Sequence, residues 1–346
     1  MKFTRLTSAV LAIVLVLFCL PACSQEVAYA DTVFVGMDTV ITLRLAKKGV
    51  SAEALAEAAE QCQQLVASYE KVLSAHEEDS DVANLNKNIQ MQVNNNPLLL
   101  NVLDTAFQIT VLTDGAYDPT IGTLTSLWNI TAGGPVPSRG DIREAMGHVG
   151  ISNLSVDGTT IEKKDRFTQI DLGGVGKGYT LQALLTYLNS TDIPYGIVSM
   201  GGNIGVFGSK GNDTLYKIGI KDPRKTDSVV GYLYAGGGFV SVSGDYERYF
   251  EEGGQRYHHI IDPSTGYPAN NGLTSVICYT QNGASADALS TALFVMGLEK
   301  SLAFYEEGSI SFEAIFITED YEIYMTDGIR EKEQFELTAS KYTVAN

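Results

Sequence analysis

The spacing of apolar side chains divides the first third of the chain into a strand pair and two helices. Residues 33–45 alternate around Gly36, which predicts a strand pair that enters the fold. Residues 51–73 are rich in Ala, Glu, Gln and Leu with apolar residues at helical spacing, and Ser51 can serve as the N-cap. Residues 97–112 have the pattern of a second helix. This part of the chain is therefore predicted to supply one strand pair and two long helices.

The middle of the chain is punctuated by turn residues. Residues 141–146 predict a short helix, and residues 151–170 predict a hairpin. The hairpin is expected to turn at Asp157-Gly158, a dipeptide that favours tight hairpin turns. Residues 196–242 contain short β-rich runs separated by Gly, Asp and Pro, which predicts an antiparallel meander.

The remaining patterns complete a mixed α+β fold. Residues 175–189 and 284–297 predict helices, and residues 314–317 and 322–325 predict strands. No internal repeat or low-complexity linker separates these elements. We therefore expect two intimately packed lobes rather than independent domains.

The N-terminus has the pattern of a targeting segment. Lys2 and Arg5 precede the apolar run Leu6 to Leu20, which is too short for a comfortable membrane span. The following Leu20-Pro21-Ala22-Cys23 resembles a bacterial lipobox, which implies cleavage before Cys23 and lipidation of its thiol. The alternative is an ordinary signal peptide that is cut near Ala28 to Ala30 and discards Cys23.

With a lipobox, the chain divides into three parts. Residues 1–22 are the expected lipoprotein signal peptide, residues 23–32 a polar tether, and residues 33–346 the folded domain. The predicted location is the bacterial cell membrane, with the domain lipid-anchored on the extracytoplasmic face.

Charge and cysteine content narrow the class of function. The 346 residues contain 24 Lys and Arg against 41 Asp and Glu, and the net charge of −17 disfavours binding to nucleic acid. Cys62 lies in a helical pattern and Cys278 in a strand-like run, so both are expected to be buried free thiols, although a disulfide between them stays open. No Cys and His spacing indicates a zinc site.

Two separated segments suggest a site for a metal-bound pyrophosphate. In residues 170–180, IDLGGVGKGYT, an apolar strand-like run ends at Asp171 and a glycine-rich turn opens a helix. In residues 285–291, SADALST, Asp287 and Thr291 stand four apart and share one helix face. A carboxylate and a hydroxyl are part of a typical shell for a hard cation.

Each segment also has a plainer interpretation. The first lacks both a Walker A loop and the GxGxxG dinucleotide fingerprint, and it fits a tight strand-to-helix turn capped by Asp171. In the second, Asp287 fits a carboxylate that the helix dipole favours, and Thr291 fits a hydroxyl that bonds back to a carbonyl.

Three further segments join turn residues to acids, bases or hydrogen-bond donors. Two of the four histidines, His258 and His259, stand beside the turn Asp262-Pro263, which suggests proton chemistry. The plainer interpretation is one satisfied structural histidine and one exposed histidine. The three segments are residues 117–122, 243–249 and 257–266.

Taken in order, six segments resemble the ApbE family, the FAD:protein FMN transferases. The likeness covers nearly the whole chain after the leader, and it implies a two-lobed fold with a T-fold-like core and FAD in the cleft between the lobes. The segments are DPTIGTLTSLW (118–128), DLGGVGKGYTLQ (171–182), SMGGNIGVFG (199–208), SVSGDYERYF (241–250), HHIIDPSTGYP (258–268) and ADALSTALFVMG (286–297).

The resemblance also implies roles for individual residues. The metal site would use the side chains of Asp287 and Thr291 and the backbone carbonyl of Gly174. Asp287 and His259 would be the catalytic residues, with His259 as the general base. His76 falls where the family often has Tyr. The implied flavin-contacting positions are Met37, His76, Asp118, Pro119, Thr120, Asp171, Lys177 and Ile261.

The implied reaction is Mg²⁺-dependent transfer of FMN from FAD to a threonine or serine hydroxyl of an acceptor protein. It would leave a phosphoester-linked flavin and free AMP, with a membrane redox subunit or a secreted flavoprotein as acceptor. Two alternatives stay open: an FAD pyrophosphatase that yields FMN and AMP, and a flavin-binding lipoprotein without catalysis.

Overall fold

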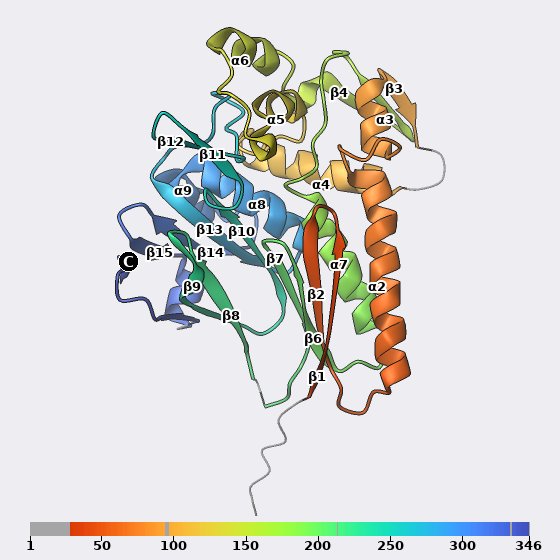
Figure 1. Cartoon of the computed structure of the whole chain (residues 1–346), viewed down its shortest axis with the longest axis vertical. Helices are drawn as coiled ribbons and strands as arrows, with labels where there is room; N and C mark the ends of the chain where they lie inside the picture. The colour runs from red at the N-terminus through yellow and green to blue at the C-terminus, as the bar shows by residue number, and fades with distance from the viewer. Residues whose placement is uncertain (1–27, 94–96, 213, 333, 346) are drawn as a thin grey trace, which may run out of the picture.

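A nine-stranded sheet runs through the part of the chain that the computed structural model describes, which is residues 28–93, 97–212, 214–332 and 334–345 (Figure 1). The strand order is β1-β2-β6-β7-β10-β13-β14-β15-β17. Neighbouring strands are antiparallel except β15 and β17, which are parallel. The strands are β1 (Tyr29–Gly36), β2 (Thr39–Ala46), β6 (Tyr195–Met200), β7 (Asn203–Gly208), β10 (Gly238–Gly244), β13 (Leu273–Thr280), β14 (Glu313–Thr318), β15 (Glu322–Met325) and β17 (Thr343–Val344).

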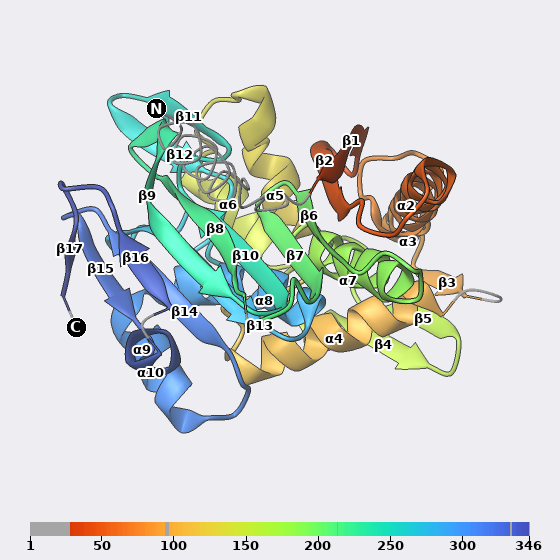
Figure 2. The same ribbon diagram turned by 90° about the horizontal axis from the view of Figure 1, so that it is seen from below.

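Both faces of this sheet are buried. Along β13, Val276 and Cys278 pack into the core on the side of the helices, whereas Ile277 packs with Ile218 and Leu233 on the other side. That second side is covered by a three-stranded sheet, which lies across the large sheet from the helices (Figure 2). Its strands are β8 (Tyr216–Asp222), β9 (Lys225–Ala235) and β16 (Phe335–Leu337).

The helix layer combines amphipathic helices with one helix that is buried on nearly all sides. Ser51 caps the N-terminus of α2, where its Oγ accepts from the N–H of Ala54 at 3.1 Å. α8 packs against β10, β13 and α7, which explains why it is apolar nearly all round. The helices of this layer are α2 (Ala52–Leu73), α4 (Leu98–Leu112), α7 (Gly176–Asn189), α8 (Gly283–Met296) and α9 (Leu298–Glu307), and the short α10 (Asp327–Glu331) lies near β14.

Shorter elements form a second part of the molecule, over one end of the sheet (Figure 1). The indole N–H of Trp128 donates to the carbonyl of Gly266 at 2.7 Å and ties this part to the segment after β12. The elements are α3 (Asp81–Lys87), α5 (Gly122–Trp128), α6 (Arg139–Met146), β3 (Gln90–Gln92), β4 (Leu154–Asp157), β5 (Thr160–Lys163), β11 (Tyr249–Glu252) and β12 (Gln255–His258), with 3₁₀ turns at Ile130–Ala132 and Ile151–Asn153.

The structure confirms the mixed α+β fold class and most predicted elements. The strand pair, the four long helices and the hairpin turn at 157–158 occur within a few residues of their predicted bounds. Cys62 and Cys278 are buried free thiols, as expected.

Two predictions about strands and the predicted end of the tether are wrong. The meander over 196–242 is interrupted, because β8 and β9 leave the large sheet to cover its second face. The predicted strand before Asp171 is replaced by a single bridge between Gln169 and Ile121. β1 begins at Tyr29, so residues 29–32 lie in the sheet rather than in a tether.

The predicted signal peptide, residues 1–22, and the predicted lipid site, Cys23, lie outside the described residues. Within the described ranges, none of the helices combines the length and the apolar character needed to cross a membrane.

Candidate active site

Helices α7 and α8 meet at two glycines, and this contact builds the centre of the site. A Cβ at Gly178 would lie 2.1 Å from the carbonyl oxygen of Gly283, and a Cβ at Gly283 would lie 2.5 Å from that of Gly178. The N–H of Gly283 also donates to Oε1 of Gln182 at 2.8 Å. The two helix N-termini therefore approach more closely than any residue with a Cβ would permit.

Asp287 is the buried carboxylate at this contact. Its Oδ2 accepts from the backbone N–H of Gly178 at 2.8 Å, and its Oδ1 accepts from Nδ2 of Asn203 at 3.0 Å. The hydroxyl of Ser241 lies 3.4 Å from Oδ1. Asn203 on β7 and Ser241 on β10 are register partners, so the sheet presents both to the same carboxylate.

Thr291 and Gly174 lie on the same side of α8 as Asp287. A Cβ built on Gly174 would lie 3.4 Å from Oγ1 of Thr291, which shows how near the glycine loop is to the helix. Oγ1 of Thr291 lies 3.5 Å from the carbonyl of Asp287 and 3.4 Å from Oγ of Ser243, both long contacts that leave the hydroxyl weakly engaged.

Buried hydroxyls extend this oxygen-rich centre. Oγ of Ser290 lies 3.1 Å from that of Ser241 and 2.9 Å from that of Ser243. The sequence placed Asn203, Ser241 and Ser243 in two of the family-like segments but gave them no role. Their membership in those segments, and that of Ser243 in the polar segment 243–249, was the available signal.

These oxygens fit a small hard cation. Carboxylate, hydroxyl and carbonyl oxygens are ligands of Mg²⁺, and a carboxylate that accepts two hydrogen bonds still has lone pairs free. In the described part of the chain there is no cluster of three or more His, Cys, Asp or Glu side chains suited to a metal. Any cation between α7 and α8 would therefore depend on such mixed oxygen ligands.

The glycine-rich loop before α7 is held by Asp171. Oδ1 of Asp171 accepts from the N–H of Gly173 at 2.8 Å, and Oδ2 accepts from Oγ1 of Thr125 at 2.9 Å. Asp171 does not cap α7, because the N-cap is Val175 and no side chain caps it. Lys177 in the first turn donates from Nζ to the carbonyl of Gly173.

The predicted flavin-contacting residues at 118–120 form a turn beside this loop. Oδ1 of Asp118 accepts from the N–H of Thr120 at 2.8 Å and from its hydroxyl at 2.6 Å. Burial raises the pKa of Asp118, and the bonds from Thr120 partly oppose this effect. The carbonyl of Pro119 accepts from the N–H of Asp171 at 2.8 Å, which joins the two segments.

Met37 lies in the turn between β1 and β2 and reaches the same loop. Its backbone has a positive φ of 49°, and its N–H donates to Oε1 of Glu70 at 2.8 Å. Its sulfur lies 3.3 Å from the hydroxyl of Thr180, and its methyl group lies 3.6 Å from a Cβ built on Gly176. Met37 and the glycine-rich loop therefore both lie against the first turns of α7.

The adjacent histidines have different environments. His258 is buried and satisfied: its Nε2 donates to the carbonyl of Ala269 at 2.8 Å, and its Nδ1 lies 3.3 Å from the N–H of Ile260. Burial lowers its pKa.

His259 is exposed to solvent, and many protein atoms stand around its ring. These surroundings lower the pKa of His259 well below its ordinary value, and the charges of His258, Arg248 and Lys177 act in the same direction. The imidazole is therefore neutral at pH 7, and Lys177 is near enough to influence it.

Two predicted flavin positions are not part of this centre. Ile261 is buried in the apolar cluster around Trp128. His76 is exposed after α2, where its N–H donates to Oγ of Ser74 at 3.1 Å, and its ring contacts none of the other described site residues. Their roles as flavin contacts stay predictions.

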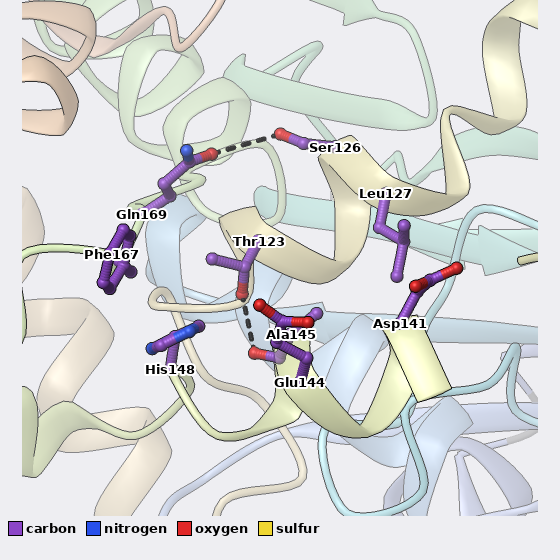
Figure 3. A pocket seen from close by; sticks show the side chains of 9 residues that line it. All are labelled: Thr123, Ser126, Leu127, Asp141, Glu144, Ala145, His148, Phe167 and Gln169. Carbon is purple, nitrogen blue, oxygen red and sulfur yellow. Dashed lines mark hydrogen bonds between the residues drawn. The ribbon is translucent and has the colours of Figure 1, made fainter. Parts of the chain in front are cut away.

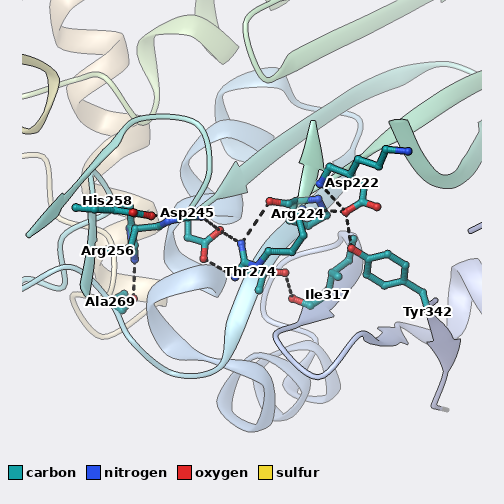
Figure 4. A network of polar contacts seen from close by, with 12 residues as sticks. Asp222, Arg224, Asp245, Arg256, His258, Ala269, Thr274, Ile317 and Tyr342 are labelled. Atoms are coloured by element: carbon teal, nitrogen blue, oxygen red, sulfur yellow. Dashed lines mark hydrogen bonds and ion pairs between the residues drawn. The ribbon is translucent and has the colours of Figure 1, made fainter. Parts of the chain in front are cut away.

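Two surface pockets are lined by residues of the family-like segments. One of about 460 Å³ lies between α5 and α6 and is lined by Thr123, His148 and Gln169, among others (Figure 3). The other, of about 350 Å³, lies beside His258 and contains Arg224, which forms a bidentate pair with Asp245 at 2.7 and 2.8 Å (Figure 4). Neither pocket is lined by Asp287, Thr291 or Gly174.

Sequence comparisons connect this geometry to known proteins. The sequence model described as the ApbE family matches residues 37–316. The chain is 33% identical over 315 residues to the FAD:protein FMN transferase of Treponema pallidum (strain Nichols), which covers 84% of this chain and 85% of that protein. It is 32% identical over 256 residues to the FAD:protein FMN transferase of Vibrio cholerae. That match covers 72% of this chain and 76% of that protein.

Solved structures have the same fold. The ApbE protein of Thermotoga maritima superposes with a TM-score of 0.80 at 32% identity and covers 88% of this chain and 99% of that chain. The flavin transferase ApbE of Vibrio cholerae superposes with a TM-score of 0.77 at 25% identity, with the same shares covered.

Proposed function

The chain belongs to the ApbE family and transfers FMN from FAD to another protein, and we propose that the transfer uses Mg²⁺ and ends in a phosphoester. The acceptor group is a threonine or serine hydroxyl, and AMP is the leaving group. FAD is the substrate and Mg²⁺ the cofactor.

The observation that carries this proposal is the oxygen cluster between α7 and α8. The carboxylate of Asp287, the hydroxyl of Thr291 and the backbone of Gly174 converge there, beside the N-terminus of α7. The helix dipole at that N-terminus favours an anionic group such as a pyrophosphate. When bound to these three residues, Mg²⁺ would neutralise charge on the pyrophosphate and on the departing AMP.

His259 is the proposed general base. Its lowered pKa keeps the imidazole neutral and able to accept a proton at pH 7, and its ring is open to solvent. His258 cannot take this role, because both of its ring nitrogens are engaged in the core.

The transfer step balances as a single displacement at phosphorus. The hydroxyl oxygen of the acceptor forms a bond to the FMN phosphorus, and the bond from that phosphorus to the bridging oxygen of AMP breaks. AMP leaves with the electron pair, and the acceptor proton passes to the imidazole of His259. Asp171 bonds to Thr125 and to Gly173 in the glycine-rich loop. These bonds fix the backbone of Gly174, whose carbonyl is a proposed ligand of Mg²⁺.

We also propose that Cys23 carries a lipid and anchors the enzyme on the extracytoplasmic face of the bacterial cell membrane. The lipobox-like Leu20 to Cys23 supports this placement. Tyr29 begins β1 and Met37 directly follows its last residue, so the two lie about 25 Å apart at the usual rise per residue. Because Met37 contacts α7, the site lies near the end of β1 that is farther from the proposed anchor. This arrangement suits an acceptor such as a membrane redox subunit or a secreted flavoprotein.

Release of AMP tests this proposal. A form that begins at Ser24 is incubated with FAD and Mg²⁺, with and without a flavoprotein whose FMN-bearing threonine is known. Transfer predicts AMP only when the acceptor is present. Equal amounts of AMP and free FMN without an acceptor would show a pyrophosphatase instead, and intact FAD in both reactions would show a binding protein.

A further inference from the structure

Tyr117 ends in a buried hydroxyl that has no partner. The residue is 5% exposed, and its phenolic oxygen is one of two buried side-chain oxygens or nitrogens without a hydrogen bond among the described residues. A buried donor that stays unpaired is destabilising, so such a group calls for an explanation.

The hydroxyl end of Tyr117 lies in the oxygen cluster. A Cβ built on Gly174 would lie 3.0 Å from Cε2 of Tyr117 and 3.7 Å from Cδ2, so the ring passes Gly174 with the end that bears the hydroxyl. Asp287, Asp171 and Asp118 are near enough that their charges act on the phenol. The unpaired hydroxyl therefore lies near Gly174 and within the influence of three carboxylates, and it bonds to none of them.

The phenol is a donor at this place. The ordinary pKa of a tyrosine phenol is about 10, well above neutral pH. The hydroxyl keeps its proton at neutral pH and can donate to a new oxygen, while repulsion between the carboxylates favours a cation nearby.

We propose that Tyr117 positions the ligands of this reaction by donating its phenolic O–H to an oxygen that enters with the Mg²⁺–FAD complex. That oxygen belongs either to the pyrophosphate or to a water that the cation carries. The inference rests on the proposed site at Asp287 and adds to it a residue without a metal-ligating or basic role.

The test compares two substitutions that each remove one buried hydroxyl. Tyr117→Phe removes the unpaired group. Tyr216→Phe removes the hydroxyl that donates to the carbonyl of Phe207 at 2.8 Å, in the core on the opposite face of the sheet. Calorimetric titration gives the Kd for Mg²⁺ alone and for FAD in the presence of Mg²⁺, and thermal melting gives the stability of each ligand-free variant.

The proposal predicts opposite results for the two variants. Tyr117→Phe should melt at the wild-type temperature or above without ligands, and it should bind the ligands about 10- to 100-fold more weakly, as for the loss of a hydrogen bond to a charged group. Tyr216→Phe should melt earlier and bind normally. A loss with Mg²⁺ alone identifies the water as the acceptor, and a loss only with FAD present identifies the phosphate.

Unchanged affinities in Tyr117→Phe, or earlier melting without ligands, would overturn the proposal, since the hydroxyl would then be idle or structural. Asp287→Ala in the same titrations separates this failure from a failure of the site itself. If Asp287→Ala binds Mg²⁺ like the wild type, the metal site is wrong; if it does not and Tyr117→Phe does, only the role of Tyr117 is wrong.

Discussion

Gly178 and Asp287 are joined across the contact between α7 and α8, where the N–H of Gly178 donates to Oδ2 of Asp287 at 2.8 Å. A Cβ at Gly178 would lie 2.6 Å from the Cβ of Asp287. The absence of a side chain at 178 thus brings the carboxylate to the first turn of α7, and the proposed metal site depends on the fit of two helices.

Gly178→Ala should disrupt both the helix contact and the site. The added methyl group would lie 2.1 Å from the backbone oxygen of Gly283, and overpacking of this kind typically costs about 1–3 kcal/mol and occasionally more. Urea unfolding should show this loss, and Mg²⁺ affinity should fall with it. Gly140→Ala in α6 is the control, since its Cβ would meet only Oγ of Ser138 at 3.5 Å. Equal stability of the two variants would contradict this picture of the contact.

Asn203→Ala should weaken metal binding without removing a ligand. Its amide holds Oδ1 of Asp287 at 3.0 Å, and loss of such an outer partner typically costs about 10- to 100-fold in affinity. Ser241→Ala should cost less, because its hydroxyl lies 3.4 Å from the same oxygen. Calorimetric titration with Mg²⁺ measures both, and the reverse order of the two effects would count against the assigned geometry.

The transfer rate should stay constant from pH 8 down to the ordinary histidine pKa of about 6.5 and fall only at lower pH. The base acts unprotonated, and the lowered pKa of His259 keeps it unprotonated until the pH falls through that lower value. His259→Ala should lose about 10²- to 10⁴-fold in kcat/KM, together with the acidic limb of the profile. A wild-type midpoint at or above 6.5, or full activity in His259→Ala with normal FAD binding, would exclude this base.

Cys62 and Cys278 should resist thiol reagents in the folded protein. Both are completely buried, and burial raises the pKa of Cys62 to about 12 and that of Cys278 further. In a form that begins at Ser24, an aromatic disulfide reagent should find no reactive thiol until urea is added, and then two. Absence of both thiols after unfolding would reveal a disulfide between them.

Local patterns predicted the helices and the hairpin because each is set by neighbouring residues. α8 followed from the apolar pattern of residues 284–297, and the turn at Asp157-Gly158 from the dipeptide itself. The pairing of Asp287 with Thr291 followed from helical spacing alone, and the role of Gly174 came with the family resemblance.

Local sequence patterns do not predict contacts between residues that are far apart in the chain. The register that places Ser241 opposite Asn203 joins residues that stand 38 positions apart in the chain. The departure of β8 and β9 depends on the apolar second face of the large sheet, which they cover. The unpaired hydroxyl of Tyr117 became visible only once the glycine loop and α8 were placed beside it.

The most direct test of the proposed reaction is the mass of an acceptor flavoprotein after incubation with the enzyme, FAD and Mg²⁺, with Asp287→Ala as the matched control. The account predicts a gain equal to FMN minus water on a threonine or serine, absent with Asp287→Ala and absent when the metal is chelated. An unmodified acceptor with the wild-type enzyme, or the same gain with Asp287→Ala, would contradict it.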